Sequence, residues 1–208
     1  MNAEELAPAI GQRGVIVGRT GTGKSTLARV LVYAMAQRQP LVIIDPKGDF
    51  APPVPCMALT GAGQSLRGRN IIYRPSLDSD VVSDVDSILR SVYNAGNCAV
   101  YIDELFGIQE KGNYPPALLP LYTRGRSRGI TVLGAVQRPC KVPLETISEC
   151  DRHYTFALQM GDDRRRMAEV SGRAGRGVPP RYHFWYSVTN AEEDASIPDA
   201  PLTLRMPE

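Results

Sequence analysis

The chain lacks the features that mark several classes of protein. Its 208 residues include four cysteines, Cys56, Cys98, Cys140 and Cys150, with no CxxC spacing, and only two histidines. These numbers disfavour a zinc site and a disulfide framework, so we expect reduced thiols. No apolar run approaches the roughly 18 residues of a membrane span, and residues 1–14 begin acidic, without the apolar segment of a secretory signal. We therefore expect a cytoplasmic protein without a membrane span.

Net charge is also small, but it is unevenly distributed. The formal net charge is +2. Residues 121–181 contain 12 Lys and Arg against 6 Asp and Glu, whereas residues 182–208 contain 1 against 5. We expect the basic block to offer a surface for a polyanion and the acidic end to be a solvated extension.

Strand-like and helix-like segments alternate along the chain. The expected strands are 15–17, 41–44, 70–73, 98–102, 130–136, 154–158 and 182–188. The expected helices are 24–37, 80–95, 117–126 and 162–170, and the expected loops are 51–69, 107–116 and 171–181. This order predicts right-handed βαβ units and an α/β fold with a mostly parallel sheet.

The motif with the most specific pattern lies at residues 18–25, Gly-Arg-Thr-Gly-Thr-Gly-Lys-Ser, which fits G-x-x-x-x-G-K-[ST] between a predicted strand and a predicted helix. Such a loop directs backbone N–H groups and a helix N-terminus at phosphates. The alternative is a glycine-rich turn that contains a lysine by chance and binds no phosphate. We expect Lys24 to reach the β- and γ-phosphates and Ser25 to hold Mg²⁺. The predicted nucleotide-binding residues are Gly18, Arg19, Thr20, Gly21, Thr22, Gly23, Lys24, Ser25 and Thr26.

Two further strand ends carry polar side chains suited to hydrolysis. Asp103 and Glu104 follow the apolar segment 98–102, and Gln137 follows the segment 130–136. We expect Asp103 to bind Mg²⁺ through water, Glu104 to activate the attacking water, and Gln137 to sense the γ-phosphate. A second acid beside the first favours hydrolysis over phosphate transfer to a small molecule.

Taken together, five segments resemble the FtsK–HerA superfamily of DNA-translocating P-loop ATPases. In chain order they are the P-loop, Asp45-Pro46-Lys47-Gly48, Asp103-Glu104, residues 125–130, and Gln137-Arg138-Pro139. The match extends over about residues 13–140. It implies a RecA/ASCE-like three-layer sandwich that forms a ring, usually a hexamer, and moves double-stranded DNA by hydrolysing ATP.

The resemblance also implies catalytic roles. Lys24, Glu104 and Gln137 would act within one subunit. Arg126 would be the arginine finger on the γ-phosphate bound by a neighbouring subunit, with Arg124 and Arg128 as alternatives.

The chain is too short to include the additional domains that are characteristic of other superfamily members. We expect one ATPase domain, with a motor core at about 13–160, a basic helix-loop and C-terminal strand at 161–189, and an acidic tail at 190–208. This minimal core is most similar to the small genome-packaging ATPases of tailless icosahedral viruses with an internal membrane. A capsid or portal-vertex protein would then be a partner, in the host cytoplasm or the virion. A plasmid-transfer or segregation ATPase, a small-molecule kinase and a nucleotide-dependent scaffold are the alternatives.

DNA contacts are expected from basic loops, because phosphate contacts need positive charge and no sequence readout. The candidates are Lys111, Lys141, Arg164, Arg165, Arg166, Arg173, Arg176 and Arg181. Solvated arginines with no such role are the alternative for each. The aromatic run 182–186 is expected in the sheet core or at a subunit interface rather than against DNA bases.

Overall fold

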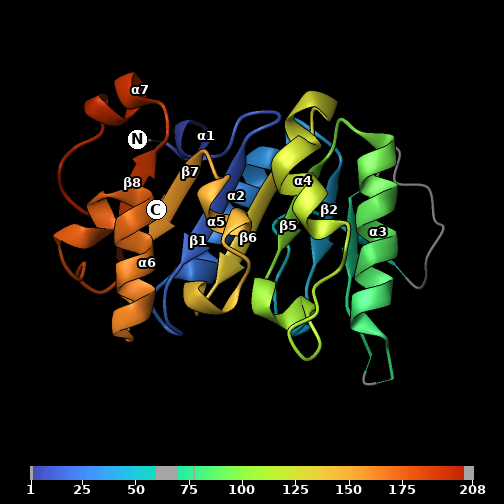
Figure 1. Ribbon diagram of the computed structural model, residues 1–208. Helices are drawn as coiled ribbons and strands as arrows, with labels where there is room; N and C mark the ends of the chain where they lie inside the picture. The colour runs from blue at the N-terminus through green and yellow to red at the C-terminus, as the bar shows by residue number, and fades with distance from the viewer. Residues whose placement is uncertain (1, 60–69, 77, 204–208) are drawn as a thin grey trace.

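A single sheet runs through the computed structural model, which describes residues 2–59, 70–76 and 78–203 (Figure 1). The strand order is β3-β4-β2-β5-β6-β1-β7-β8-β9. The strands are β1 (Arg13–Val17), β2 (Leu41–Ile44), β3 (Met57–Ala58), β4 (Ile71–Tyr73), β5 (Ala99–Ile102), β6 (Thr131–Val136), β7 (Arg152–Thr155), β8 (His183–Val188) and β9 (Leu202–Thr203). The strands from β3 to β7 in this order pair in parallel, and β8 and β9 are antiparallel to their neighbours.

Helices cover both faces of the sheet. They are α1 (Ala3–Leu6), α2 (Lys24–Ala36), α3 (Val81–Ala95), α4 (Leu118–Arg124), α5 (Glu145–Ser148), α6 (Gly161–Ser171) and α7 (Ala191–Ser196). Short 3₁₀ turns are η1 (Leu105–Ile108), η2 (Gly125–Arg128), η3 (Pro139–Lys141) and η4 (Arg173–Arg176). Side chains of α3, α4, α5 and α6 pack in one core layer, and those of α1 and α2 pack in the other. No helix among the described residues is long and apolar enough to cross a bilayer.

The central strands are apolar on both sides because both sides are covered. In β1, Val15 and Val17 face one core layer while Ile16 faces the other, as the alternation of side chains along a strand requires. The predicted α/β fold with a mostly parallel sheet is confirmed.

Some short elements differ from the expectation. Strand β7 begins at Arg152, two residues before the predicted start at 154, because its side chains include polar ones that are buried by specific partners. Strand β3 lies in the predicted loop 51–69, of which residues 60–69 are outside the described part of the chain. Both residues of β3 are exposed, so no apolar pattern marks it.

The acidic tail is not a solvated extension over residues 190–203. Asn190 caps α7 by accepting hydrogen bonds from the backbone of Glu192 and Glu193. Ile197 is buried in the core, and β9 pairs with β8 and forms one edge of the sheet. Residues 204–208, the rest of that expectation, lie outside the described residues.

Because the central strands are parallel, their carboxyl ends lie together along one side of the sheet, here called the carboxyl edge, and their amino ends lie along the opposite side, the amino edge. The strands β5, β6, β1 and β7 are neighbours and run in the same direction. Their carboxyl ends therefore bring the P-loop, Asp103-Glu104 and Gln137 to one edge. The turn η2, which precedes β6, lies at the opposite edge.

Candidate nucleotide-binding site

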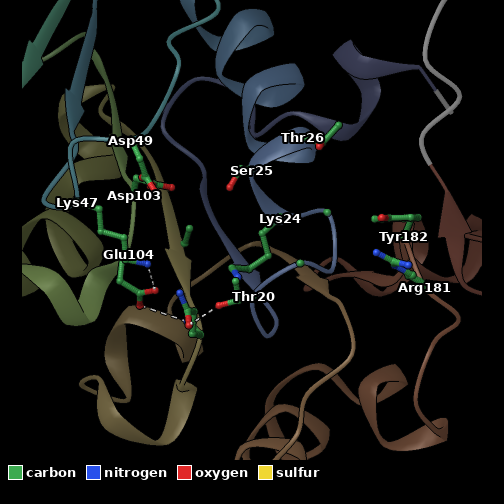
Figure 2. Close-up of a pocket in the computed structure, with 14 residues that line it drawn as sticks. Thr20, Lys24, Ser25, Thr26, Lys47, Asp49, Asp103, Glu104, Arg181 and Tyr182 are labelled. Atoms are coloured by element: carbon green, nitrogen blue, oxygen red, sulfur yellow. Dashed lines mark hydrogen bonds and ion pairs between the residues drawn. The ribbon is translucent and has the colours of Figure 1, made fainter.

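The carboxyl edge of the sheet contains a cavity of about 360 Å³ (Figure 2). This is a size at which small-molecule sites occur. Its lining residues are Thr20, Gly21, Gly23, Lys24, Ser25, Thr26, Lys47, Asp49, Asp103, Glu104, Ala135, Gln137, Arg181 and Tyr182. The structure thus brings together most of the predicted P-loop residues, the predicted acid pair and the predicted sensor.

Close packing at one position and positive φ values at two others explain the glycines of the P-loop. A Cβ atom on Gly18 would lie 2.6 Å from the Cβ of Phe156, so no side chain fits there. Gly21 and Gly23 have φ values of +76° and +107°, which favour glycine. Gly23 precedes α2 without a side-chain cap, so the first N–H groups of this helix are available to an anion.

Lys24 is poised at this anion site. Its Nζ donates to the carbonyl of Arg19 at 3.1 Å, and Thr22 Oγ1 donates to the same carbonyl at 2.8 Å. Burial lowers the pKa of Lys24, and Lys47 lowers it further, while Glu104 and Asp103 oppose the shift. A bound polyphosphate would pair with the Lys24 ammonium group and stabilise its charged form.

Oxygen ligands for a cation lie beside the P-loop. Carboxylate oxygens of Asp45, Asp49 and Asp103 lie within 4.8 Å of one another, and the Ser25 hydroxyl lines the same cavity. Asp45 already accepts hydrogen bonds from the backbone of Gly48 and Phe50 and pairs with Arg74, so it holds its own turn. Burial raises the pKa of Asp103. Hydroxyl and carboxylate oxygens are the ligands that Mg²⁺ prefers, so the donor set fits this ion.

Glu104 occupies a strained position at the end of β5. Its φ is +86°, which is rare for a residue with a side chain. The Glu104 residue is only 7% exposed. Its carboxylate accepts hydrogen bonds from Lys47 Nζ at 3.1 Å and from the Gln137 backbone N–H at 3.3 Å. Gln137 in turn accepts a hydrogen bond from Thr20 Oγ1 at 3.1 Å. The acid, the amide and the P-loop are therefore physically connected.

Arg126 does not reach this cavity. It lies in η2, at the opposite edge of the sheet, and pairs with Asp151, which also pairs with the buried Arg13. Arg128 donates to the backbone carbonyls of Tyr93 and Asn94. The Arg124 side chain is exposed and has no polar partner within the described residues.

Three of the predicted DNA contacts are engaged in the fold. Arg173 is only 8% exposed; it donates to the carbonyls of Tyr186, Ile197 and Pro198 and pairs with Asp194. Its expected contact with DNA phosphates is wrong, because the guanidinium is buried and satisfied.

Arg166 donates to the carbonyls of Pro139 and Val142, so it fixes the segment after β6. Arg176 pairs with Asp199 in the acidic tail. Both therefore have structural partners that the sequence pattern did not reveal.

Exposed basic residues remain at the carboxyl edge. Lys111 lies in the loop after β5, and Lys141 lies in η3 after β6. Tyr114 donates to the Lys141 carbonyl at 2.9 Å, so these two loops are neighbours. Arg164 and Arg165 are exposed at the start of α6, where Arg165 pairs with Asp162.

Besides Ala135, four cavity residues were not predicted for the nucleotide site. Lys47 and Asp49 belong to the turn after β2, and the Asp-Pro-Lys-Gly pattern was the signal that could have found them. Arg181 was expected only among the DNA contacts, and Tyr182 was expected in the core or at an interface. Tyr182 is instead 53% exposed and lines the cavity, because a turn separates it from β8.

Comparisons with known proteins agree with this geometry. The family described as the central domain of helicase HerA matches residues 6–88. The DNA packaging ATPase P9 of Enterobacteria phage PRD1 is 32% identical over 165 residues, covering 74% of this chain and 67% of the phage protein.

Solved structures show the same fold. The genome packaging NTPase B204 from Sulfolobus turreted icosahedral virus 2, in complex with AMP, has a TM-score of 0.68 at 17% identity and covers 92% of this chain and 95% of its own. The pCW3 conjugation coupling protein TcpA has a TM-score of 0.59 at 15% identity, over 87% of this chain and 58% of its own. By its sequence relatives, the chain belongs to the viral genome-packaging branch of the FtsK–HerA superfamily of P-loop ATPases.

Proposed function

We propose that this protein hydrolyses ATP to move double-stranded DNA and so packages a viral genome into a preformed capsid. One observation carries the proposal. A chain related to a phage DNA packaging ATPase joins a P-loop lysine, a cation-binding set of oxygens and a strained, buried glutamate in one cavity.

Within that cavity each residue has a defined task. The N–H groups of the P-loop and Lys24 bind the β- and γ-phosphates. Ser25 and Asp103 would hold Mg²⁺, which neutralises phosphate charge when bound. Glu104 accepts the proton of the attacking water, and Gln137, which is linked to both Glu104 and Thr20, positions that water.

Arg126, the predicted arginine finger, can reach only the site of another subunit. Arg126 precedes β6, and the strand separates it from its own P-loop by about 20 Å, since six residues rise roughly 3.3 Å each. Asp151 also pairs with Arg13, and a carboxylate oxygen of Glu149 lies 3.8 Å from Arg13, so two arginines and two carboxylates balance in this cluster. Asp151 orients the Arg126 guanidinium at the surface, where the Arg126 side chain is 59% exposed. We infer that Arg126 serves a neighbour's site in a ring, expected to be a hexamer, with Arg124 as the alternative.

DNA would be tracked by the exposed basic residues at the carboxyl edge. Lys111, Lys141, Arg164 and Arg165 follow the ends of three successive strands. Within the described part of the chain, their ion pairs are exposed ones with neighbours in the sequence, Lys111 with Glu110 and Arg165 with Asp162. Contacts of this kind bind the phosphate backbone without reading sequence. A capsid or portal-vertex protein is the expected further partner.

The decisive experiment is steady-state ATP hydrolysis with and without linear duplex DNA, comparing the wild type with Glu104→Gln. We expect duplex DNA to stimulate the wild type and the variant to lose turnover by about 10²-fold or more, since a positioned base contributes about that much. The variant should still bind ATP, because the P-loop is intact. Turnover that ignores DNA and survives in Glu104→Gln would overturn the motor and the role of Glu104 together.

A further inference from the structure

Arg181 and Tyr182 form a wall of the nucleotide cavity, apart from the residues proposed to bind phosphates and Mg²⁺. Figure 2 shows them on one side of the P-loop, while Lys47, Asp103 and Glu104 lie on the other side. The γ-phosphate must lie near Glu104 if this acid is to activate water. A nucleotide held by the P-loop then extends its base away from Glu104, toward Tyr182.

The backbone at Tyr182 is strained in a way that packing does not explain. The N–H of His183 donates to the carbonyl of Pro180 at 3.0 Å, which closes a turn around Arg181 and Tyr182. Tyr182 has a φ of +63° in this turn, a conformation that glycine adopts without cost. Strain of this kind persists where the side chain is needed, and this ring is largely outside the core.

The ring is held ready at the cavity. The Arg181 guanidinium lies over the ring, 4.7 Å from its centroid, so one ring face is covered. A Cβ placed on Gly23 would lie 3.5 Å from Tyr182 Cδ1, so the ring edge borders the P-loop. The turn is anchored by Trp185 Nε1, which donates to the carbonyl of Gly177 at 2.9 Å. More than half of Tyr182 is exposed, which leaves the other ring face available to a planar ligand.

We propose that Tyr182 is the platform on which the base of the bound nucleotide stacks, with Arg181 backing the ring. The inference rests on the proposed function, because the P-loop must hold the phosphates. Stacking uses the face of a base and not its hydrogen-bonding edges, so it discriminates little between purines. ADP and GDP should therefore bind with similar affinity, and inorganic tripolyphosphate, which has no base, should gain nothing from Tyr182.

The test is calorimetric binding of Mg²⁺–ADP and Mg²⁺–tripolyphosphate to the full chain and to variants of Tyr182. Tyr182→Ala should weaken ADP binding about 5- to 150-fold, the range that alanine substitution gives for base–aromatic stacking, while tripolyphosphate binding stays unchanged. Tyr182→Phe keeps the ring and should bind ADP as the wild type does. Tyr182→Gly should weaken ADP binding as alanine does, yet raise the melting temperature, because glycine relieves the left-handed strain.

Two results would overturn the inference: ADP binding that is unchanged in Tyr182→Ala, or equal losses for ADP and tripolyphosphate. Failure of the proposed function looks different, since a wild type that never hydrolyses ATP can still show ADP affinity that depends on Tyr182. DNA-stimulated hydrolysis with normal ADP binding in Tyr182→Ala would retain the motor and remove the platform.

Discussion

Asp151 shows how a single carboxylate is tuned by its neighbours. Burial raises its pKa, but hydrogen bonds from Arg13 and Arg126 outweigh this effect and hold the pKa below the ordinary value of 3.8. A lowered pKa in the folded state contributes stability above the unfolded pKa, and that stability is lost as the pH falls through the folded pKa.

We therefore predict a pH-dependent cost for Asp151→Asn. At pH 7 it should lose about 2 kcal/mol of unfolding free energy, because the buried Arg13 loses its ion pair at 3.1 Å and keeps only the exposed Glu149, at 3.8 Å, as a counter-charge. The gap to the wild type should be constant above about pH 5 and narrow progressively below it. Urea unfolding at a series of pH values measures this. Asp162→Asn, at an exposed pair with Arg165, should cost little at any pH; a gap for Asp151→Asn that widens in acid would contradict the sign.

Site residues that belong to a local sequence motif could be predicted. Site residues that the fold brings in from a turn distant in sequence could not. Lys24 and Ser25 follow the P-loop pattern, and Asp103 and Glu104 follow an apolar strand, so their edge of the sheet was predictable. Tyr182 looked like one member of an aromatic strand. Its position in the cavity depends on a turn with positive φ, and no glycine marks that turn.

At the scale of elements, predictability follows burial. The strands β1, β2, β5 and β6 are covered on both faces and appear as short apolar runs, so their ranges were close to the predicted ones. The elements α7 and β9 are short and mostly polar, and tertiary contacts stabilise them. Arg173 carries the same lesson: its charge suggested DNA, but its burial beneath α7 makes it part of the fold.

The contact between α7 and η4 gives a prediction about the acidic tail. Asp194 pairs with buried Arg173 at 3.0 Å and accepts a hydrogen bond from the Val188 N–H at 3.0 Å. Asp194→Ala should lower the unfolding free energy by about 2 kcal/mol, because a buried arginine loses its counter-charge. Chemical denaturation checks this.

Asp199→Ala is the matched control, since Asp199 belongs to the same tail and pairs with the exposed Arg176. It should cost less than about 0.5 kcal/mol. A loss for Asp194→Ala as small as that for Asp199→Ala would mean that the tail behaves as a solvated extension.

At the scale of the whole molecule, the sheet separates the two halves of the proposed catalytic machinery. The P-loop and Glu104 lie at the carboxyl edge, and Arg126 lies at the amino edge. One subunit cannot bring them together by moving a loop, because a six-residue strand intervenes. Motifs far apart in the sequence predicted both halves, but the order of the strands, which separates them, is a property of the folded chain. Activity should consequently depend on assembly.

Mixing two inactive variants tests this dependence. Lys24→Ala removes the phosphate-binding lysine but keeps Arg126, and Arg126→Ala does the reverse, so each alone should hydrolyse ATP at least about 10³-fold more slowly than the wild type. In a randomly mixed ring, about one interface in four pairs an intact P-loop with an intact arginine, so DNA-stimulated hydrolysis should return toward a quarter of the wild-type rate. A mixture of Lys24→Ala with Glu104→Gln should stay inactive, because both lesions damage the same site and every site carries one of them. Full activity in Arg126→Ala alone would transfer the role to Arg124, and loss in Arg126→Ala without recovery on mixing would show that the arginine stabilises its own subunit rather than serving its neighbour.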